Sequence, residues 1–213
     1  MDWQLDAAAV RALGALMEKE ITTPEYYPLS LNALVNACNQ KSNRDPVVSY
    51  DEDTVEEALA RLRAEGLAVR ISGDSRVPKH AQRLTEKFNL GRREAAVMCV
   101  LMLRGPQTVG ELRGRTERMY TFDDLETVEN TLLHLAETGF VQALPRLAGS
   151  REPRHGHLLS GALEAVAESP AAAPAPAAAT AGRGGADSER IAELDRALAQ
   201  LRSEFEDFRR RFE

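Results

Sequence analysis

The chain has 213 residues, 28% charged and 43% hydrophobic, and its 27 Lys and Arg against 33 Asp and Glu leave a net charge of −6. This composition excludes bulk disorder, and the acidic balance argues against strong non-specific binding of nucleic acid, although a local basic patch remains possible. No apolar run approaches the roughly 18 residues of a transmembrane helix. Asp2 and Asp6 stand where a signal peptide needs basic residues before an apolar stretch. We therefore expect a cytoplasmic protein that does not contact a membrane.

The first 165 residues contain an internal repeat. Residues 55–69 align with residues 128–142 at a constant offset of 73, and residues 28–34 align with residues 106–112 at an offset of 78. Each copy also begins with an apolar helical pattern, at Val10–Met17 in the first and at Ala95–Leu103 in the second. Self-similarity on this scale indicates two copies of one supersecondary unit.

Each copy predicts three helices followed by a β-hairpin. The second helix is short and begins at Ser30 or Thr108, and the third ends at Gly66 or Gly139, because glycine favours the position after a helix. An extended apolar run follows, at 67–71 or 140–144, and a return strand is expected near Ala81–Leu84 or His157–Ser160. This order is the winged-helix arrangement of the helix-turn-helix group.

The composition changes near residue 168. Residues 169–186 are almost entirely Ala, Pro and Gly, which predicts a disordered or semi-stiff linker. Apolar residues then recur at alternating steps of three and four from Ile191 to Phe212, as in a coiled-coil seam. That stripe must pair with another copy, with the globular part or with a partner. The predicted fold is therefore mainly α with small β-hairpin wings: winged-helix domains at 1–85 and 86–165, a linker at 166–187 and a coiled-coil-like helix at 188–213. A homo-oligomer through 191–212 is one expectation.

One long polar string carries a family resemblance. The string Asn-Gln-Lys-Ser-Asn-Arg-Asp-Pro occupies residues 39–46, and it accompanies Leu16–Lys19 and Glu152–Arg154. Together these residues resemble the YceH-like family of bacterial proteins, over roughly residues 3–165. The resemblance implies a tandem winged-helix fold and a tail that ends in a coiled coil, and it implies almost nothing about biochemical role. The pair His155-Gly156 departs from the family's usual Tyr-Ala.

Cations in the turns and wings are the candidate contacts for nucleic acid or for a partner. Helix-turn-helix proteins read bases with the start of the third helix, but here that segment is acidic in both copies, from Asp51 to Glu57 and from Asp123 to Glu129. Phosphates would be repelled there, whereas such acids complement a helix dipole. The turns carry the opposite charge and could grip phosphates. The candidate residues are Asn39, Gln40, Lys41, Asn43, Arg44, Arg113, Arg115, Arg118, Arg151 and Arg154.

Signals for an enzyme are weak. His155 and His157 share a strand face near Glu152, but no third strong metal ligand lies near them in sequence. Cys38 and Cys99 lack a CxxC partner and lie in apolar helical patterns, which predicts that both are buried, reduced thiols. No nucleophile elbow, phosphate-binding loop or dinucleotide fingerprint occurs. We expect no enzyme activity, no metal and no cofactor.

Two functions remain open. The first is a DNA-associated regulator that holds double-stranded DNA by phosphate contacts from turns and wings. The second is a protein-interaction platform that does not bind DNA and that would suit the acidic third helices. The segment 82–93 between the repeats is either a basic saddle or a connector whose Phe88 and Leu90 fill the inter-domain contact.

Overall fold

A computed structural model describes residues 4–71, 77–146 and 152–162. The chain divides into two units, Met1–Ala167 and Glu168–Glu213, and all described residues belong to the first. The predicted linker at 166–187 and the predicted heptad helix at 188–213, with its oligomer contact, lie outside the described residues. Among the described helices, none is long and apolar enough to cross a membrane.

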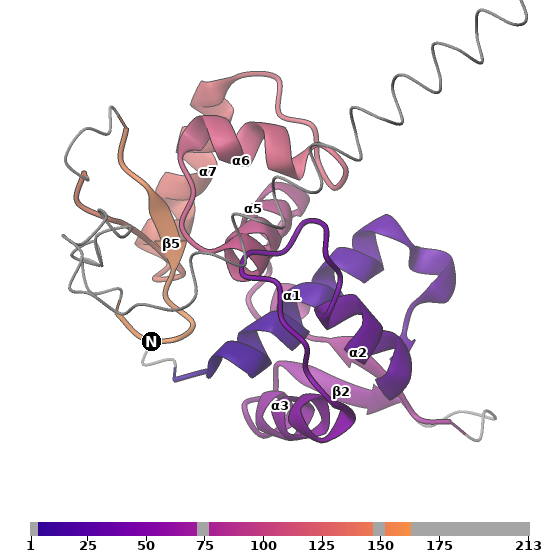
Figure 1. The fold of residues 1–213 in the computed structure, drawn as a ribbon. Coiled ribbons are helices and arrows are strands. Elements are labelled where there is room, and N and C mark those ends of the chain that lie inside the picture. The colour runs from indigo at the N-terminus through magenta and orange to yellow at the C-terminus, as the bar shows by residue number, and fades with distance from the viewer. Residues whose placement is uncertain (1–3, 72–76, 147–151, 163–213) are drawn as a thin grey trace, which may run out of the picture. The chain divides into compact units, whose positions relative to one another are not determined.

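The N-terminal half, which we define as α1 to α4, combines helices with a three-stranded antiparallel sheet (Figure 1). The strands lie in the order β1-β3-β2, so that Leu29 in β1 and Arg70 in β2 both face His80 in β3. The short helix α4 follows the sheet directly and leads to the next half. The elements are α1 (Ala7–Thr22), a 3₁₀ turn (Pro24–Tyr26), β1 (Leu29–Ser30), α2 (Leu31–Cys38), α3 (Glu52–Ala64), β2 (Ala68–Ile71), β3 (Lys79–Gln82) and α4 (Leu84–Lys87).

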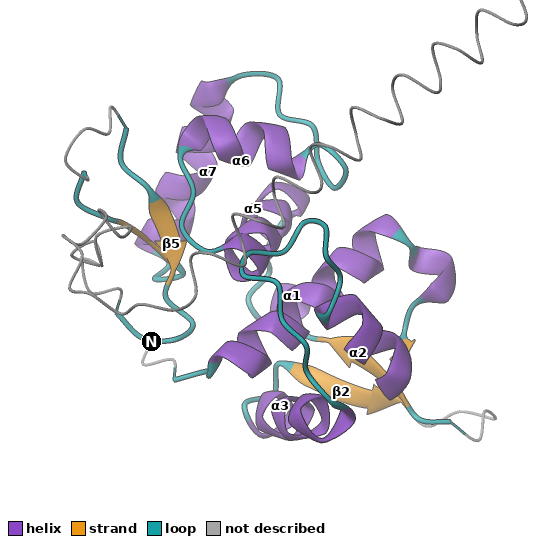
Figure 2. Ribbon diagram, in the orientation of Figure 1, coloured by secondary structure: helices purple, strands orange, loops and turns teal. Residues whose placement is uncertain are grey.

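The C-terminal half, which we define as α5 to β5, repeats this order. An antiparallel bridge between Gln107 and His155 takes the place of the β1–β3 pairing, and β4 and β5 form a two-stranded antiparallel sheet. Its elements are α5 (Arg92–Arg104), α6 (Val109–Thr116), α7 (Leu125–Glu137), β4 (Val141–Ala143) and β5 (His155–His157). The described chain is thus mainly helical with small antiparallel sheets, as predicted (Figure 2).

Equivalent helices in the two halves begin and end by the same local chemistry. The Ser30 and Thr108 hydroxyls accept hydrogen bonds from the backbone N–H groups of Ala33 and Glu111 at the starts of α2 and α6. Gly66 and Gly139, just beyond α3 and α7, adopt φ values of +66° and +79°. The left-handed conformation costs glycine little, so these caps confirm the predicted helix ends.

The return strands lie earlier than predicted. They run over Lys79–Gln82 and His155–His157, two residues before the expected Ala81–Leu84 and His157–Ser160. The physical reason is backbone pairing on both sides of each return strand. His80 in β3 pairs with Leu29 as well as with β2, and His155 in β5 pairs with Gln107 as well as with β4. Leu84, which the expected strand included, is instead buried in α4.

The two halves share one hydrophobic core, and α1 lies at its centre. Residues Ala9 to Glu18 of α1 are all buried, as expected of a helix that is covered on every side. It packs on α2 and α3 within its own half and on α5 of the other (Figure 1). Gly14 lies at the crossing, where a Cβ added to this glycine would stand 3.0 Å from the Met102 Cβ and the Leu103 Cδ2 atom. The Cys99 thiol also reaches the Gly14 carbonyl oxygen, at 3.5 Å.

We predict that Gly14→Val will destabilise the protein by about 1–3 kcal/mol, because the added carbons would overpack the α1–α5 crossing. Gly114→Val in α6 is the matched control, since an added Cβ there meets nothing within 4 Å. Both variants replace a helical glycine with valine, so the difference between their urea midpoints measures the destabilisation that comes from overpacking at the α1–α5 crossing. Equal midpoints would show that α1 and α5 do not depend on the close approach.

Candidate functional site

Arg44, the central cation of the polar string, is buried. Its side chain is 0% exposed, and its Nη2 atom lies 2.6 Å from Glu18 Oε2, a residue of α1 that is itself 2% exposed. Arg44 also donates to the Ala37 carbonyl oxygen at the end of α2 and to the Gln40 Oε1 atom. The guanidinium of Arg44 is therefore enclosed by protein acceptors, and the structure does not present it to a nucleic acid or a partner.

The buried pair keeps Glu18 ionised. Burial by itself would raise the pKa of the Glu18 carboxyl, but the hydrogen bonds and charge of Arg44, with Lys19 and Arg118, lower this pKa below its usual value. Arg118 of the C-terminal half reaches Glu18 Oε1 at 2.8 Å. One carboxylate thus receives guanidinium groups from both halves.

Three further residues of the string hold the loop in place, Asn39 within the N-terminal half and Asn43 and Asp45 at the junction with α5. Asn39 donates to the Tyr50 carbonyl oxygen at 2.7 Å and accepts from the Tyr50 N–H at 2.8 Å. Asn43 accepts a 2.7 Å hydrogen bond from Arg104 of α5. The Asp45 N–H donates to the Leu103 carbonyl oxygen at 2.9 Å, near the end of that helix. The string therefore packs against the junction of the two halves, and exposed Lys41 is the cation that it leaves toward solvent.

The candidate arginines of the C-terminal half also have internal acceptors. Arg113 donates to the Phe122 and Asp123 carbonyl oxygens ahead of α7. Arg115 and Arg154 both approach Glu111, at 3.4 and 2.9 Å. Arg115, Arg118 and Arg154 keep 35%, 51% and 37% of their side-chain surface exposed, and Arg113 is exposed as well, so an outside contact by these four residues stays a prediction. Arg151 lies outside the described residues.

The connector between the halves packs apolar side chains against the core, while its cations Arg83, Lys87, Arg92 and Arg93 stay exposed. Phe88 and Leu90 are half-buried and pack against the core. The Phe88 ring meets the Phe140 ring edge-on, with 5.2 Å between their centroids. Of the two alternatives for this segment, the structure favours the connector that fills the contact.

The third helices, α3 and α7, present carboxylates at their starts. Asp51 and Asp124 accept hydrogen bonds from the backbone N–H groups of Thr54 and Thr127. Bonds from the threonine side chains and backbone lower the pKa of both aspartates, so both stay charged at neutral pH. The exposed acids of the first turns add to these caps. Their placement matches the positive end of the helix dipole, as predicted.

Helix α7 also exposes apolar residues, which sequence reasoning missed. Leu125 and Leu133 are 46% and 60% exposed and stand eight residues apart, hence on one face of the helix, with Glu129 between them. A signal was available, because Leu133 breaks the spacing of the buried positions Val128, Leu132 and Leu135. We call Leu125, Glu129, Leu133 and Glu137 the α7 stripe.

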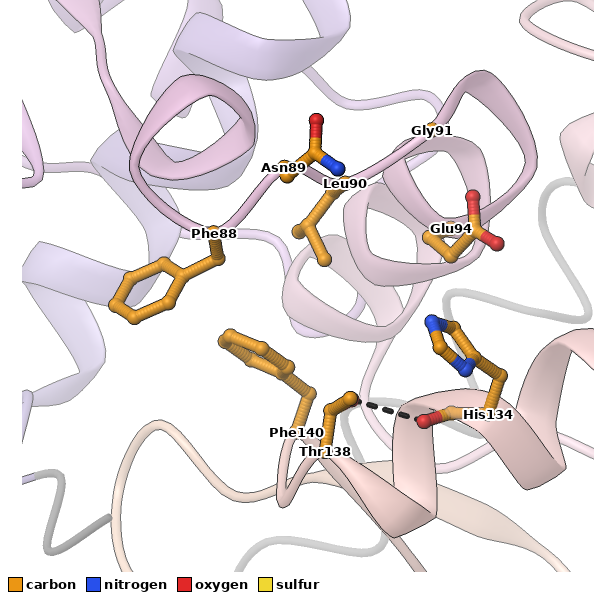
Figure 3. A pocket seen from close by; sticks show the side chains of 8 residues that line it. All are labelled: Phe88, Asn89, Leu90, Gly91, Glu94, His134, Thr138 and Phe140. Carbon is orange, nitrogen blue, oxygen red and sulfur yellow. Dashed lines mark hydrogen bonds between the residues drawn. The ribbon is translucent and has the colours of Figure 1, made fainter.

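One pocket lies near each end of α7, and Leu125 of the α7 stripe lines the one at its start. The larger, about 490 Å³, lies at the C-terminal end of α7. Figure 3 shows the apolar side chains of Phe88, Leu90 and Phe140 on one side of it and Glu94 and His134 on the other. The second, about 390 Å³, lies at the start of α7 and is lined by Leu125, Phe122 and residues of α6. The first volume falls in the range of small-ligand sites, and so does the second.

The histidines and cysteines do not assemble a metal site among the described residues. No group of three or more His, Cys, Asp and Glu is close enough there to hold a metal ion. Burial lowers the pKa of His157 to about 4. Cys38 and Cys99 are buried free thiols, as predicted, and burial raises the pKa of Cys38 to about 12.

Comparisons with known proteins identify relatives over the whole chain. A family model described as "Protein of unknown function, DUF480" matches residues 5–150. A UPF0502 protein of Solibacter usitatus is 68% identical over 100% of both chains. A UPF0502 protein of Citrifermentans bemidjiense is 50% identical over 93% of this chain and 90% of its own, and one of Koribacter versatilis is 55% identical over 73% of each.

We predict that Glu18→Gln will cost about 3–5 kcal/mol at neutral pH, because it leaves the buried Arg44 charge without its counter-ion. The folded-state pKa of Glu18 is lowered, so its contribution is present above the unfolded pKa, about 4.3, and is lost as pH falls through the folded value. Urea unfolding at pH 7 and pH 3 tests this. The difference in unfolding free energy between the wild type and Glu18→Gln should be smaller at pH 3 than at pH 7. An equal difference at both pH values would contradict the ionised Glu18–Arg44 pair. Glu56→Gln, on the exposed face of α3, is the control.

We also predict a separate loss of stability between pH 6.5 and pH 4 from His157. Its pKa is about 4 in the folded protein and about 6.5 unfolded, so its stabilising contribution is present above 6.5 and lost as pH falls toward 4. The expected loss is about 2–3 kcal/mol. His157→Gln should flatten the unfolding free energy over this interval, and an unchanged pH profile would rule out burial of the neutral ring.

Proposed function

The chain belongs to the DUF480 (UPF0502) family of bacterial proteins, and on that premise we propose that its two halves are winged-helix units that form a protein-interaction platform, with α7 as the docking face. In each half, three helices are followed by two antiparallel strands, and a strand or bridge before the second helix pairs with the return strand. This order supports the winged-helix assignment.

The observation that carries the proposal is the α7 stripe, whose Leu125 lines the pocket at the start of the helix, with a second pocket at the other end of α7. Large exposed apolar residues beside concave sites are a feature of protein-binding surfaces. The equivalent face of α3 has Glu52 and Ala60 where α7 has Leu125 and Leu133, at the repeat offset of 73. The apolar character therefore belongs to α7 and is not a general property of the repeat.

The chemistry of the stripe defines its partner. Carboxylates of Glu126, Glu129 and Glu137 accompany the leucines, so a complementary segment carries basic residues between apolar anchors. From Leu125 to Thr138 the helix rises about 20 Å, and one pocket lies at each end. A basic segment with two apolar side chains about that far apart fits this surface.

A DNA-associated function is the second candidate, and the partly exposed guanidinium groups of Arg115 and Arg118 favour it. Against it, the third helices that would enter a major groove carry acids, which phosphates repel. Most of the cations expected to grip phosphates are engaged with carbonyl oxygens and carboxylates of the protein itself.

We predict that the full-length protein will not bind a generic labelled duplex at physiological salt. Fluorescence anisotropy at low and at physiological salt is the measurement. Binding at physiological salt that Arg115→Gln and Arg118→Gln abolish would favour the DNA-associated function over the platform.

We further predict that a photo-crosslinking residue at position 133 will capture a protein in bacterial cells, and that the same residue at exposed Tyr26 will not. The captured protein, once purified, should bind about tenfold more weakly to Leu133→Ala and Glu129→Lys than to the wild type. Val47→Ala, at another exposed apolar residue, should leave the affinity unchanged. Equal capture at positions 133 and 26, or equal affinities of all variants, would overturn the docking face.

A further inference from the structure

The junction of the two halves carries more positive than negative charge. Arg44, Arg118 and Lys19 all approach Glu18, at 2.6, 2.8 and 3.5 Å. Arg115 and Arg154 share Glu111. Arg104 donates to the neutral amide oxygen of Asn43. The two carboxylates of Glu18 and Glu111 thus pair with five cations, and Arg104 adds a sixth positive charge.

Three of these guanidinium groups line one shallow pocket. Arg104 ends α5, Arg115 lies near the end of α6, and Arg118 follows α6, and the same pocket is lined by Asn43 and Glu18. Burial lowers the pKa of Arg104, and the charges of Arg115 and Arg118 lower it further. The charge of Asp45 raises it by less, so the pKa lies below its usual value. Helix dipoles explain a cation at the end of α5 or α6, but they do not explain why all three groups converge on one place.

We propose that Arg104, Arg115 and Arg118 form a binding site for a phosphate-class oxyanion at the mouth of this pocket. The pocket holds about 10 Å³, the space of a single water molecule, so the anion lies at its rim, on the exposed ends of Arg115 and Arg118. Guanidinium groups present paired N–H donors that match phosphate oxygens.

The Glu18 carboxylate does not oppose this anion. Its Oε2 atom accepts from Arg44, and its Oε1 atom accepts from both Arg44 and Arg118. Arg44 is buried behind it and balances its charge. Because Arg44 already balances the charge of Glu18, the positive charge of Arg118 remains available. Together with Arg104 and Arg115, it acts on the anion.

The site is independent of the docking face proposed for α7. It lies at the α5–α6 side of the junction, and the residues of the α7 stripe do not line it. Phosphate chemistry has two sources, a free phosphate or phosphorylated small molecule and the backbone of a nucleic acid. The experiment below has one arm for each.

The test is calorimetric titration of the full-length protein with inorganic pyrophosphate at constant ionic strength. We expect saturable binding to the wild type, about tenfold weaker binding to Arg115→Gln, and unchanged binding to Arg83→Gln. Arg83 is the matched control, because it also pairs with a glutamate on its own helix turn and is exposed. Arg118→Gln loses a contact to Glu18, so Arg115→Gln carries the test if Arg118→Gln fails to fold.

A duplex oligonucleotide added to the pyrophosphate complex distinguishes the sources. Displacement of pyrophosphate assigns the site to a nucleic-acid backbone, and no displacement assigns it to a small phosphate. Both outcomes support the oxyanion site. Absence of pyrophosphate binding, or equal binding by Arg115→Gln and Arg83→Gln, would overturn it, and neither result would bear on cross-linking at position 133.

Discussion

The carboxylate of Glu18 is buried beside the crossing of α1 and α5, and guanidinium groups reach it from both halves of the protein. A buried charge requires a partner, because desolvation otherwise costs several kcal/mol. Arg44 supplies it, and Arg44 comes from the loop at 39–46, which also contacts the end of α5 through Asn43 and Asp45. Gly14 completes the arrangement by letting α5 approach α1 closely. The ion pair therefore fixes a loop, two helices and the junction of the halves together.

This use of cations changes what the turns can do. From the sequence, the Asn39–Pro46 string and the arginines of the second copy are predicted to form a phosphate-binding surface. In the structure, most of those side chains bind carbonyl oxygens and carboxylates of the protein itself, and at Arg44 and Glu18 the pairing is buried. The same residue types serve either purpose, and burial decides between them. What is left for an outside ligand is the surplus of charge around Arg104, Arg115 and Arg118, together with the acidic and apolar surface of α7.

The repeat, the helices and their caps could be predicted because they depend on local signals. Ser30, Thr108, Gly66 and Gly139 act within a few residues of their own positions, and the periodic apolar residues mark each helix face. The role of Arg44 could not be predicted, because Glu18 lies 26 positions away in sequence, and the contact of Asp45 with Leu103 joins residues of different copies. The return strands were placed two residues late for a related reason, since their register depends on pairing with Leu29 and Gln107. Exposure of Leu133 had a local signal, in its break with the buried spacing of α7.

Helix α6 connects the two surfaces that remain available. Its residues Gly110, Arg113 and Gly114 line the pocket beside Leu125, while Arg115 lines the pocket at the junction. A helix of eight residues has little room to adjust one face without the other. Its start is held by the reciprocal Thr108–Glu111 cap, and Glu111 in turn accepts from both Arg115 and Arg154. Helix α6 therefore borders both surfaces, while each surface is formed by its own set of side chains.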